Sequence, residues 1–200
     1  DEAYKQYDSW TKNRPKDPYA WFKKINVLIQ QGKSRQGLDV TEQALNHFPN
    51  DPRIKAVHAN FLTKQGHLDK ASAIITEVQK YENRIPIIIL YRGELELRKK
   101  NYTEAKMLLR TYYDIEPSFQ VATLLAKALQ HTNEESKGAE ILKSELAKLE
   151  SPFIEVHTVA EYLVENNMLS DAIKYYDAFL KDYPQHFITV NNYASALIKD

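Results

Sequence analysis

The chain carries a repeating pattern of small, aromatic and proline positions. A small residue is followed four positions later by an aromatic residue or Leu, and eight positions after that by proline. The clearest copies are Ala3–Tyr7–Pro15, Ala105–Leu109–Pro117 and Ala172–Tyr176–Pro184. A spacing of four places two side chains on one face of a helix, and proline cannot continue a helix. The pattern therefore predicts amphipathic helices, each closed by a turn.

The small position recurs at a nearly constant interval. It falls at Ala3, Gly37, Ala71, Ala105, Ala139 and Ala172, so the interval is 34 residues four times and then 33. A fixed period of this length is typical of helix pairs that stack into a solenoid. Gly32, Gly66 and Asn167 fall where paired helices are joined and a left-handed residue is useful. The sequence thus predicts an all-α array.

The period also divides the chain into units. It predicts a single second helix in 1–17, full helix pairs in 18–51, 52–85, 86–119, 120–152 and 153–186, and a single first helix in 187–200. The pair at 120–152 has Lys143 at the aromatic position and no closing proline, so we expect irregular curvature there. Because the pattern opens and closes on half a pair, we expect one solenoid over 1–200 that is a fragment of a longer array.

These anchors and their period resemble tetratricopeptide (TPR) repeats along the whole chain. The resemblance implies a right-handed α–α superhelix whose first helices line a concave groove. It also implies that the groove binds a peptide or protein segment. The groove positions implied by the resemblance are Tyr19, Phe22, Lys23, Asn26, Arg53, Asn60, Lys64, Tyr91, Glu94, Arg98, His131, His157, Glu161, Asn191 and Asn192.

The implied groove changes character along the chain. Its N-terminal half is basic and aromatic, which favours an acidic or extended partner segment, whereas its C-terminal half is acidic and polar. We expect Tyr91 and Arg98 in the central contact region, where their replacement should weaken binding with little effect on melting temperature. The carboxylate clamp of TPR chaperone co-factors is matched poorly. Val57 stands where that clamp needs Asn, and Tyr91 stands where it needs a basic residue.

Composition excludes several classes of function. Lys and Arg number 27 and so do Asp and Glu, which argues against a nucleic-acid-binding surface. The chain has no Cys and only five Gly residues, so thiol chemistry and Gly-rich phosphate loops are excluded. No apolar run is long enough to insert into a membrane. His131, His157 and Glu161 are better explained as solvated side chains than as metal ligands. The sequence predicts no cofactor, metal or catalytic residue, and so no enzyme.

The consecutive degenerate repeats and the Asn191–Asn192 opening of the last helix resemble TPR proteins of bacterial envelope and exopolysaccharide systems. Lipoproteins associated with PEP-CTERM sorting are among them. This resemblance implies a periplasmic or outer-membrane-anchored setting in preference to the cytoplasm, and partners in secretion or polysaccharide assembly. Two alternatives to a binding scaffold stay open. One is a self-association module that forms a homo-oligomer, and the other is a regulatory segment of a larger enzyme.

Overall fold

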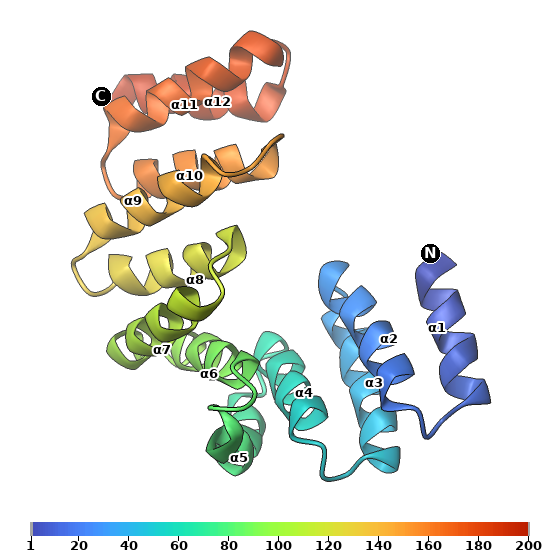
Figure 1. Cartoon of the computed structure of the whole chain (residues 1–200). Helices are drawn as coiled ribbons and strands as arrows, with labels where there is room; N and C mark the ends of the chain where they lie inside the picture. Colours follow the sequence, from blue (N-terminus) through green and yellow to red (C-terminus); the bar gives the residue numbers. More distant parts are fainter. Residues whose placement is uncertain (1, 200) are drawn as a thin grey trace. The chain divides into compact units, whose positions relative to one another are not determined.

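A computed structural model describes residues 2–199, which form twelve α-helices, one short 3₁₀ helix and no strand (Figure 1). The all-α fold predicted from the periodicity is confirmed. The helices are α1 (Glu2–Asn13), α2 (Pro18–Gln30), α3 (Ser34–His47), α4 (Pro52–Lys64), α5 (Leu68–Val78), η1 (Gln79–Tyr81), α6 (Ile87–Arg98), α7 (Tyr102–Ile115), α8 (Phe119–Gln130), α9 (Glu135–Leu146), α10 (Ile154–Glu165), α11 (Leu169–Asp182) and α12 (Phe187–Lys199).

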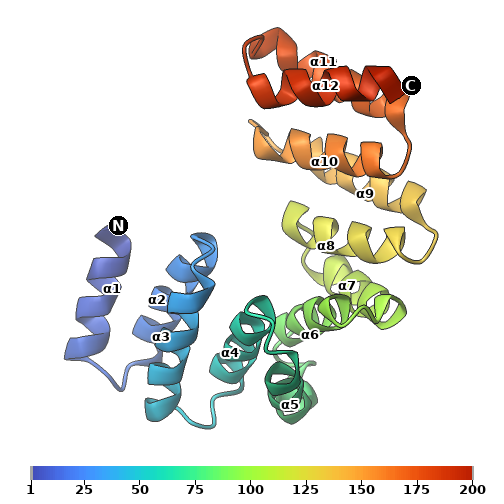
Figure 2. The same cartoon turned by 180° about the vertical axis from the view of Figure 1, so that it is seen from behind.

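Consecutive helices pack in pairs, as α2 does with α3 and α10 with α11. Both views show α2 beside α3 (Figures 1 and 2). The small residues of the repeat lie at these crossings, since Ala71, Ala105 and Ala172 are fully buried. The aromatic residues Tyr112 and Tyr176 fill the space beside them and are also buried. Small residues let helices approach, and the large neighbours fill the remaining volume.

The helices form two compact units, residues 1–112 (unit 1) and 113–200 (unit 2), and the boundary falls within α7. The two units carry opposite charge. Unit 1 contains 20 Lys and Arg residues against 13 Asp and Glu residues, a net charge of +7. Unit 2 contains 7 against 14, a net charge of −7. The neutrality of the whole chain therefore conceals one basic and one acidic unit.

Turn chemistry sets where the helices begin and end. The Asp17 and Asp51 carboxylates cap α2 and α4 by accepting backbone N–H bonds, and each is followed by proline at the first helical position. Gly32, Gly66 and Asn167 adopt positive φ, as the sequence predicts. Lys100 also has a positive φ of 64°. Nothing in its residue type indicates this, because such a conformation is unfavourable for a residue with a Cβ.

Gly37 and Gly138 are helix positions where a neighbouring side chain occupies the space of a Cβ. A Cβ on Gly37 would lie 2.3 Å from Cζ of the buried Phe61 ring. In the repeat pattern, Gly37 stands inside α3 where other repeats have Ala. The structure shows that the Phe61 ring of α4 occupies the space that an Ala side chain would need. At Gly138, a Cβ would lie 2.1 Å from the Tyr162 hydroxyl. The Tyr162 side chain of the next pair therefore occupies the space beside Gly138, one residue before the predicted small position Ala139.

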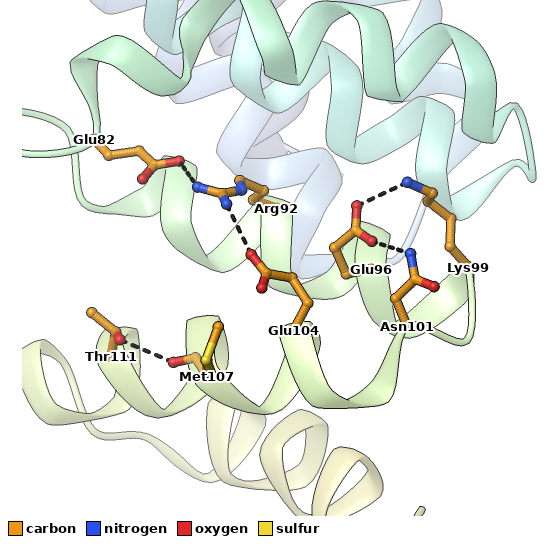
Figure 3. Close-up of polar contacts among 8 residues, drawn as sticks. All are labelled: Glu82, Arg92, Glu96, Lys99, Asn101, Glu104, Met107 and Thr111. Carbon is orange, nitrogen blue, oxygen red and sulfur yellow. Dashed lines mark hydrogen bonds and ion pairs between the residues drawn. The ribbon is translucent and has the colours of Figure 1, made fainter.

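Arg92 connects three segments near the end of α5, which has no closing proline at the repeat position. α5 ends in η1, and the Arg92 guanidinium on α6 donates to Glu82 at 2.8 Å and to Glu104 on α7 at 3.0 Å (Figure 3). Burial alone would lower the pKa of Arg92, but the two carboxylates outweigh it and raise the pKa. With one bond to each carboxylate, the guanidinium ties the segment after α5 to α6 and α7 within unit 1.

His58 is the buried imidazole of unit 1. It lies on α4 with its Nδ1 2.8 Å from the Thr41 hydroxyl on α3. Burial lowers the pKa of His58, and the more distant Glu42 opposes the shift only in part. Since the unfolded chain has an ordinary His pKa of about 6.5, it takes up a proton before the folded chain does.

This order of protonation predicts acid sensitivity near neutral pH. Stability is retained above the unfolded-state pKa and lost as the pH falls below about 6.5 towards the lower folded-state pKa. We expect the melting temperature to fall between pH 7.5 and pH 5.5, and His58→Gln to reduce that fall. His67→Gln changes an exposed histidine and serves as the control. Equal pH dependence in wild type and His58→Gln would contradict the assignment.

Candidate protein-binding surfaces

The predicted groove residues fall on the first helix of each pair. In unit 1 they lie on α2, α4 and α6, and in unit 2 they lie on α10, on α12 and at the end of α8. In unit 1 the exposed or half-buried members with polar or aromatic groups at the surface are Tyr19, Phe22, Lys23, Asn26, Arg53, Lys64 and Arg98. We call these seven residues the unit 1 first-helix surface.

Aromatic rings and cations are in contact on this surface. The Lys23 ammonium lies 5.1 Å from the centroid of the Tyr19 ring. The Arg53 guanidinium on α4 lies 4.6 Å from the Phe22 ring on α2, so this contact joins two neighbouring pairs. Cation–π contacts at exposed sites are worth about 0.5–1 kcal/mol each. They hold two long cationic side chains beside aromatic area that a partner can bury.

Arg53 is held in place by Asp51. Its Nε and Nη2 atoms donate to the two carboxylate oxygens at 3.1 and 2.6 Å, in a bidentate arrangement. Burial would raise the pKa of Asp51, but the guanidinium and the backbone N–H groups of Arg53 and Ile54 outweigh it and lower the pKa. The same carboxylate caps α4, so helix initiation and the position of the Arg53 cation share one residue.

Two predicted groove residues are buried. Asn60 on α4 and Glu94 on α6 are 34 residues apart, at equivalent positions of successive repeats, and Asn60 Nδ2 donates to Glu94 Oε2 at 2.7 Å. The repeat phase placed both residues at equivalent positions of the first helices. It did not indicate that they are buried, because packing of α4 against α6 covers both side chains. Asn60 Oδ1 is buried and has no hydrogen-bond partner among the described residues. A buried acceptor without a partner costs about 1–3 kcal/mol.

Tyr91 has a different role from the one predicted. It is largely buried and packs against two core clusters, one that contains Trp21 and Phe61 and one that contains Ile88 and Leu95. Burial, with a smaller contribution from Glu94, raises its pKa. Replacing Tyr91 with Ala would remove its contacts with both clusters, so we expect this change to lower the melting temperature. Arg98, the other residue expected in the central contact region, is exposed.

In unit 2 a pocket of about 310 Å³ lies between α8 and α10. Lys127 lines it from α8, and Thr158, Glu161 and Glu165 line it from α10. Tyr162 also lines it, and its hydroxyl lies 3.2 Å from the Ala126 carbonyl oxygen and 3.1 Å from that of Glu135. Burial, aided by the charges of Glu135 and Glu165, raises the pKa of Tyr162 to about 12. The pocket is therefore mainly acidic, and hydrogen bonds hold its tyrosine in place.

The remaining predicted residues of unit 2 do not line this pocket. His157 contacts the Phe153 carbonyl oxygen at 2.9 Å through Nδ1, and its other ring nitrogen contacts the buried Thr189 hydroxyl. His131 is exposed at the end of α8, Asn191 is exposed, and Asn192 is half-buried. Over residues 2–199 no three His, Asp or Glu side chains gather closely enough to hold a metal ion.

Comparison with known proteins gives one family match and one curated relative. A family model described as a tetratricopeptide repeat matches residues 159–186, which cover most of α10 and all of α11. The chain is 20% identical over 198 residues to tetratricopeptide repeat protein 21B of Xenopus laevis. This match covers 96% of the chain and 15% of that protein, so the chain spans a small part of its length.

Two solved structures illustrate the likeness of fold. A crystal structure of the APC/C hetero-tetramer Cut9–Hcn1 superposes with a TM-score of 0.80 at 13% identity, over 98% of this chain and 39% of that one. A crystal structure of PilW, a widely conserved type IV pilus biogenesis factor, gives 0.73 at 15% identity, over 97% and 90%. At these identities the likeness concerns the fold alone. Within residues 2–199 no helix is both long and apolar enough to span a membrane.

Proposed function

We propose that this chain of tetratricopeptide-type helix pairs is a non-catalytic protein-binding scaffold. We further propose that its unit 1 first-helix surface binds an acidic segment of a partner protein. The observation that carries the proposal is the alternation of aromatic rings and cations on α2 and α4, where Lys23 lies over Tyr19 and Arg53 over Phe22. Aromatic residues and Arg are the side chains that dominate protein interfaces.

Electrostatics favours an acidic partner. Unit 1 has a net charge of +7, and the exposed Arg98 and half-buried Lys64 extend the cationic surface onto α6 and the end of α4. Neither of these two residues has a carboxylate at ion-pair distance among the described residues. Cations without an intramolecular partner remain available for one on another molecule, and the positive field of the unit speeds the encounter.

Charge-neutralising variants test this surface. We expect the double variant Lys23→Gln/Arg53→Gln to weaken binding of a fluorescent Glu- and Leu-rich peptide by about tenfold, since two exposed charge-assisted contacts are lost. Fluorescence anisotropy at low and at physiological salt measures the affinity. The variant should also show a smaller dependence on salt.

The matched control removes two positive charges elsewhere in unit 1. Lys33 and Arg35 are exposed at the start of α3 and do not belong to the unit 1 first-helix surface. Lys33→Gln/Arg35→Gln should leave the affinity nearly unchanged. Equal weakening by both double variants would mean that net charge alone attracts the peptide. No binding of the acidic peptide, beside a basic and a neutral peptide of equal length, would overturn the proposal.

The cellular setting stays a proposal. A periplasmic or outer-membrane-anchored location and partners in exopolysaccharide assembly were implied by resemblance alone. The matched proteins include one from Xenopus laevis and a type IV pilus biogenesis factor, so they favour no single setting. The regulatory segment of a larger enzyme also stays an alternative, since the chain spans 15% of the length of its curated relative.

Self-association is the second candidate function, and the opposite charges of the two units favour it. Unit 2 of one copy carries the net charge that unit 1 of another attracts. Association of this kind would be strongest at low salt. A mass equal to one copy over a wide concentration range at low salt, measured by light scattering, would remove this candidate.

A further inference from the structure

Unit 2 holds a second pocket that none of the predicted groove residues line. It has a volume of about 400 Å³ and lies between α9, the loop that joins α9 to α10, and α11. The α9–α10 loop and the α11–α12 loop lie at the same end of unit 2 (Figures 1 and 2). The volume falls in the range of known ligand pockets, about 300–1,000 Å³. We call it the Phe153 pocket.

Aromatic rings form one wall of this pocket. Phe153 on the loop contacts Phe179 and Tyr183, with ring centroids 5.1 and 5.2 Å away, and Tyr175 adds a further ring. Phe179 is buried, but Phe153 is 41% exposed and Tyr183 is 49% exposed. Large aromatic groups that remain exposed at the mouth of a pocket supply area that a partner can bury.

The rim of the pocket is acidic. Glu150 and Asp182 line it, and no Lys or Arg does. Neither carboxylate has a hydrogen-bond or ion-pair partner within residues 2–199. The surrounding segment 144–190 contains eight Asp and Glu residues against three Lys residues. Such a field attracts cations and repels anions, which selects the charge of the occupant.

The chain already encloses one of its own cations with the same groups. The Lys24 ammonium is buried in unit 1 between the rings of Tyr4 and Trp21, at 5.5 and 5.4 Å from their centroids. The Asp8 carboxylate accepts from it at 2.7 Å. Two aromatic rings and one carboxylate are therefore sufficient, in this protein, to hold an ammonium away from water.

We propose that the Phe153 pocket binds a Lys side chain of a partner protein. Its methylene stem would lie against Phe153 and Tyr183, and its ammonium would pair with Glu150 and Asp182. The site lies on α9 and α11, the second helices of their pairs, so it is independent of the surface proposed for the acidic segment. The two sites would select opposite charges on two different segments.

Three peptides that differ at one central residue test the proposal. They carry Lys, acetyl-lysine or norleucine, so that the stem is kept while the charge is removed. By NMR titration of the chain, the Lys peptide should shift the Phe153 and Tyr183 ring signals and bind about tenfold more tightly than the other two. Equal affinity for all three would show a merely apolar pocket, and no shift at these rings would show no binding there. Either result overturns the proposal.

Paired variants distinguish binding in the Phe153 pocket from general attraction to the acidic charge of unit 2. Glu150→Gln/Asp182→Asn keeps the shape of the rim and should lower affinity for the Lys peptide about tenfold with an unchanged melting temperature. Glu161→Gln/Glu165→Gln removes two exposed carboxylates of the α8–α10 pocket and should have little effect. Equal loss in both pairs would contradict a specific site. Lys23→Gln/Arg53→Gln should leave Lys-peptide binding intact, so failure here is distinguishable from failure of the unit 1 surface.

Discussion

Replacing Asp8 with Ala is expected to lower the free energy of unfolding by about 2–4 kcal/mol, because it leaves the Lys24 ammonium buried and unpaired. Asp8 is the carboxylate that accepts from Lys24 at 2.7 Å, and the Lys24 side chain is only 4% exposed. The rings of Tyr4 and Trp21 beside the ammonium cannot replace an anion. Urea unfolding followed by Trp fluorescence measures the change, since both Trp residues lie in α1 and α2.

Two further variants identify the cause. Asp8 also pairs with Lys12, whose side chain is 74% exposed. Lys12→Ala should therefore leave the stability nearly unchanged. In Asp8→Ala/Lys24→Met no charge remains to be buried, so much of the lost stability should return. If the double variant is as unstable as Asp8→Ala, the loss comes from the packing of α1 and not from the unpaired ammonium.

Gly37→Ala is expected to destabilise the protein by about 1–3 kcal/mol, the usual cost of overpacking a core. The expected change in stability has the opposite sign to the usual one, because Ala in a helix interior is normally favoured over Gly by about 1 kcal/mol. The new methyl group would lie 2.3 Å from the Phe61 ring, which is buried in α4 and has no free space to move into. The midpoint and slope of urea unfolding measure the effect.

A double-mutant cycle locates this conflict. Phe61→Leu alone removes ring volume and should be destabilising. Combined with Gly37→Ala, it should cost less than the sum of the two single changes, because the new methyl group occupies part of the vacated space. Strict additivity would place the strain of Gly37→Ala elsewhere in α3. A stabilising effect of Gly37→Ala alone would contradict the close approach itself.

Gly37 and Lys100 show what the periodic pattern could and could not predict. The 34-residue interval indicated the helix pairs and the buried small residues, since both follow from a regular contact between helices. It indicated Gly37 as a small position but not as an obligatory one, because the reason is the Phe61 ring on another helix. Lys100, by contrast, lies 34 residues after Gly66 at the equivalent turn, so the repeat interval accounts for its left-handed conformation although its residue type does not. Tertiary contact, rather than local pattern, decides a position such as Gly37.

The binding surface was predictable to the same extent. Helix phase placed Lys23, Arg53 and Arg98 on the first helices, where the structure leaves them at the surface. Helix phase does not indicate how deeply a side chain is buried, so Asn60 was predicted as a contact residue although packing of α4 against α6 covers it. Tyr91 is partly buried against the same helices. The Phe153 pocket had no signal in the repeat, because it is formed by a loop and by second helices. The aromatic density of Phe153, Phe179 and Tyr183 was the one cue available.

The opposite charges of the two units have a practical consequence for handling the protein. Its sequence pI of about 7.2 describes a molecule that scarcely migrates in an electric field at neutral pH. A cation-exchange resin nevertheless meets one region of charge +7, and an anion-exchange resin meets another of charge −7. The protein should therefore be retained by both resins under one buffer, each contact made through a different unit. The choice of resin then selects which of the two units makes the contact.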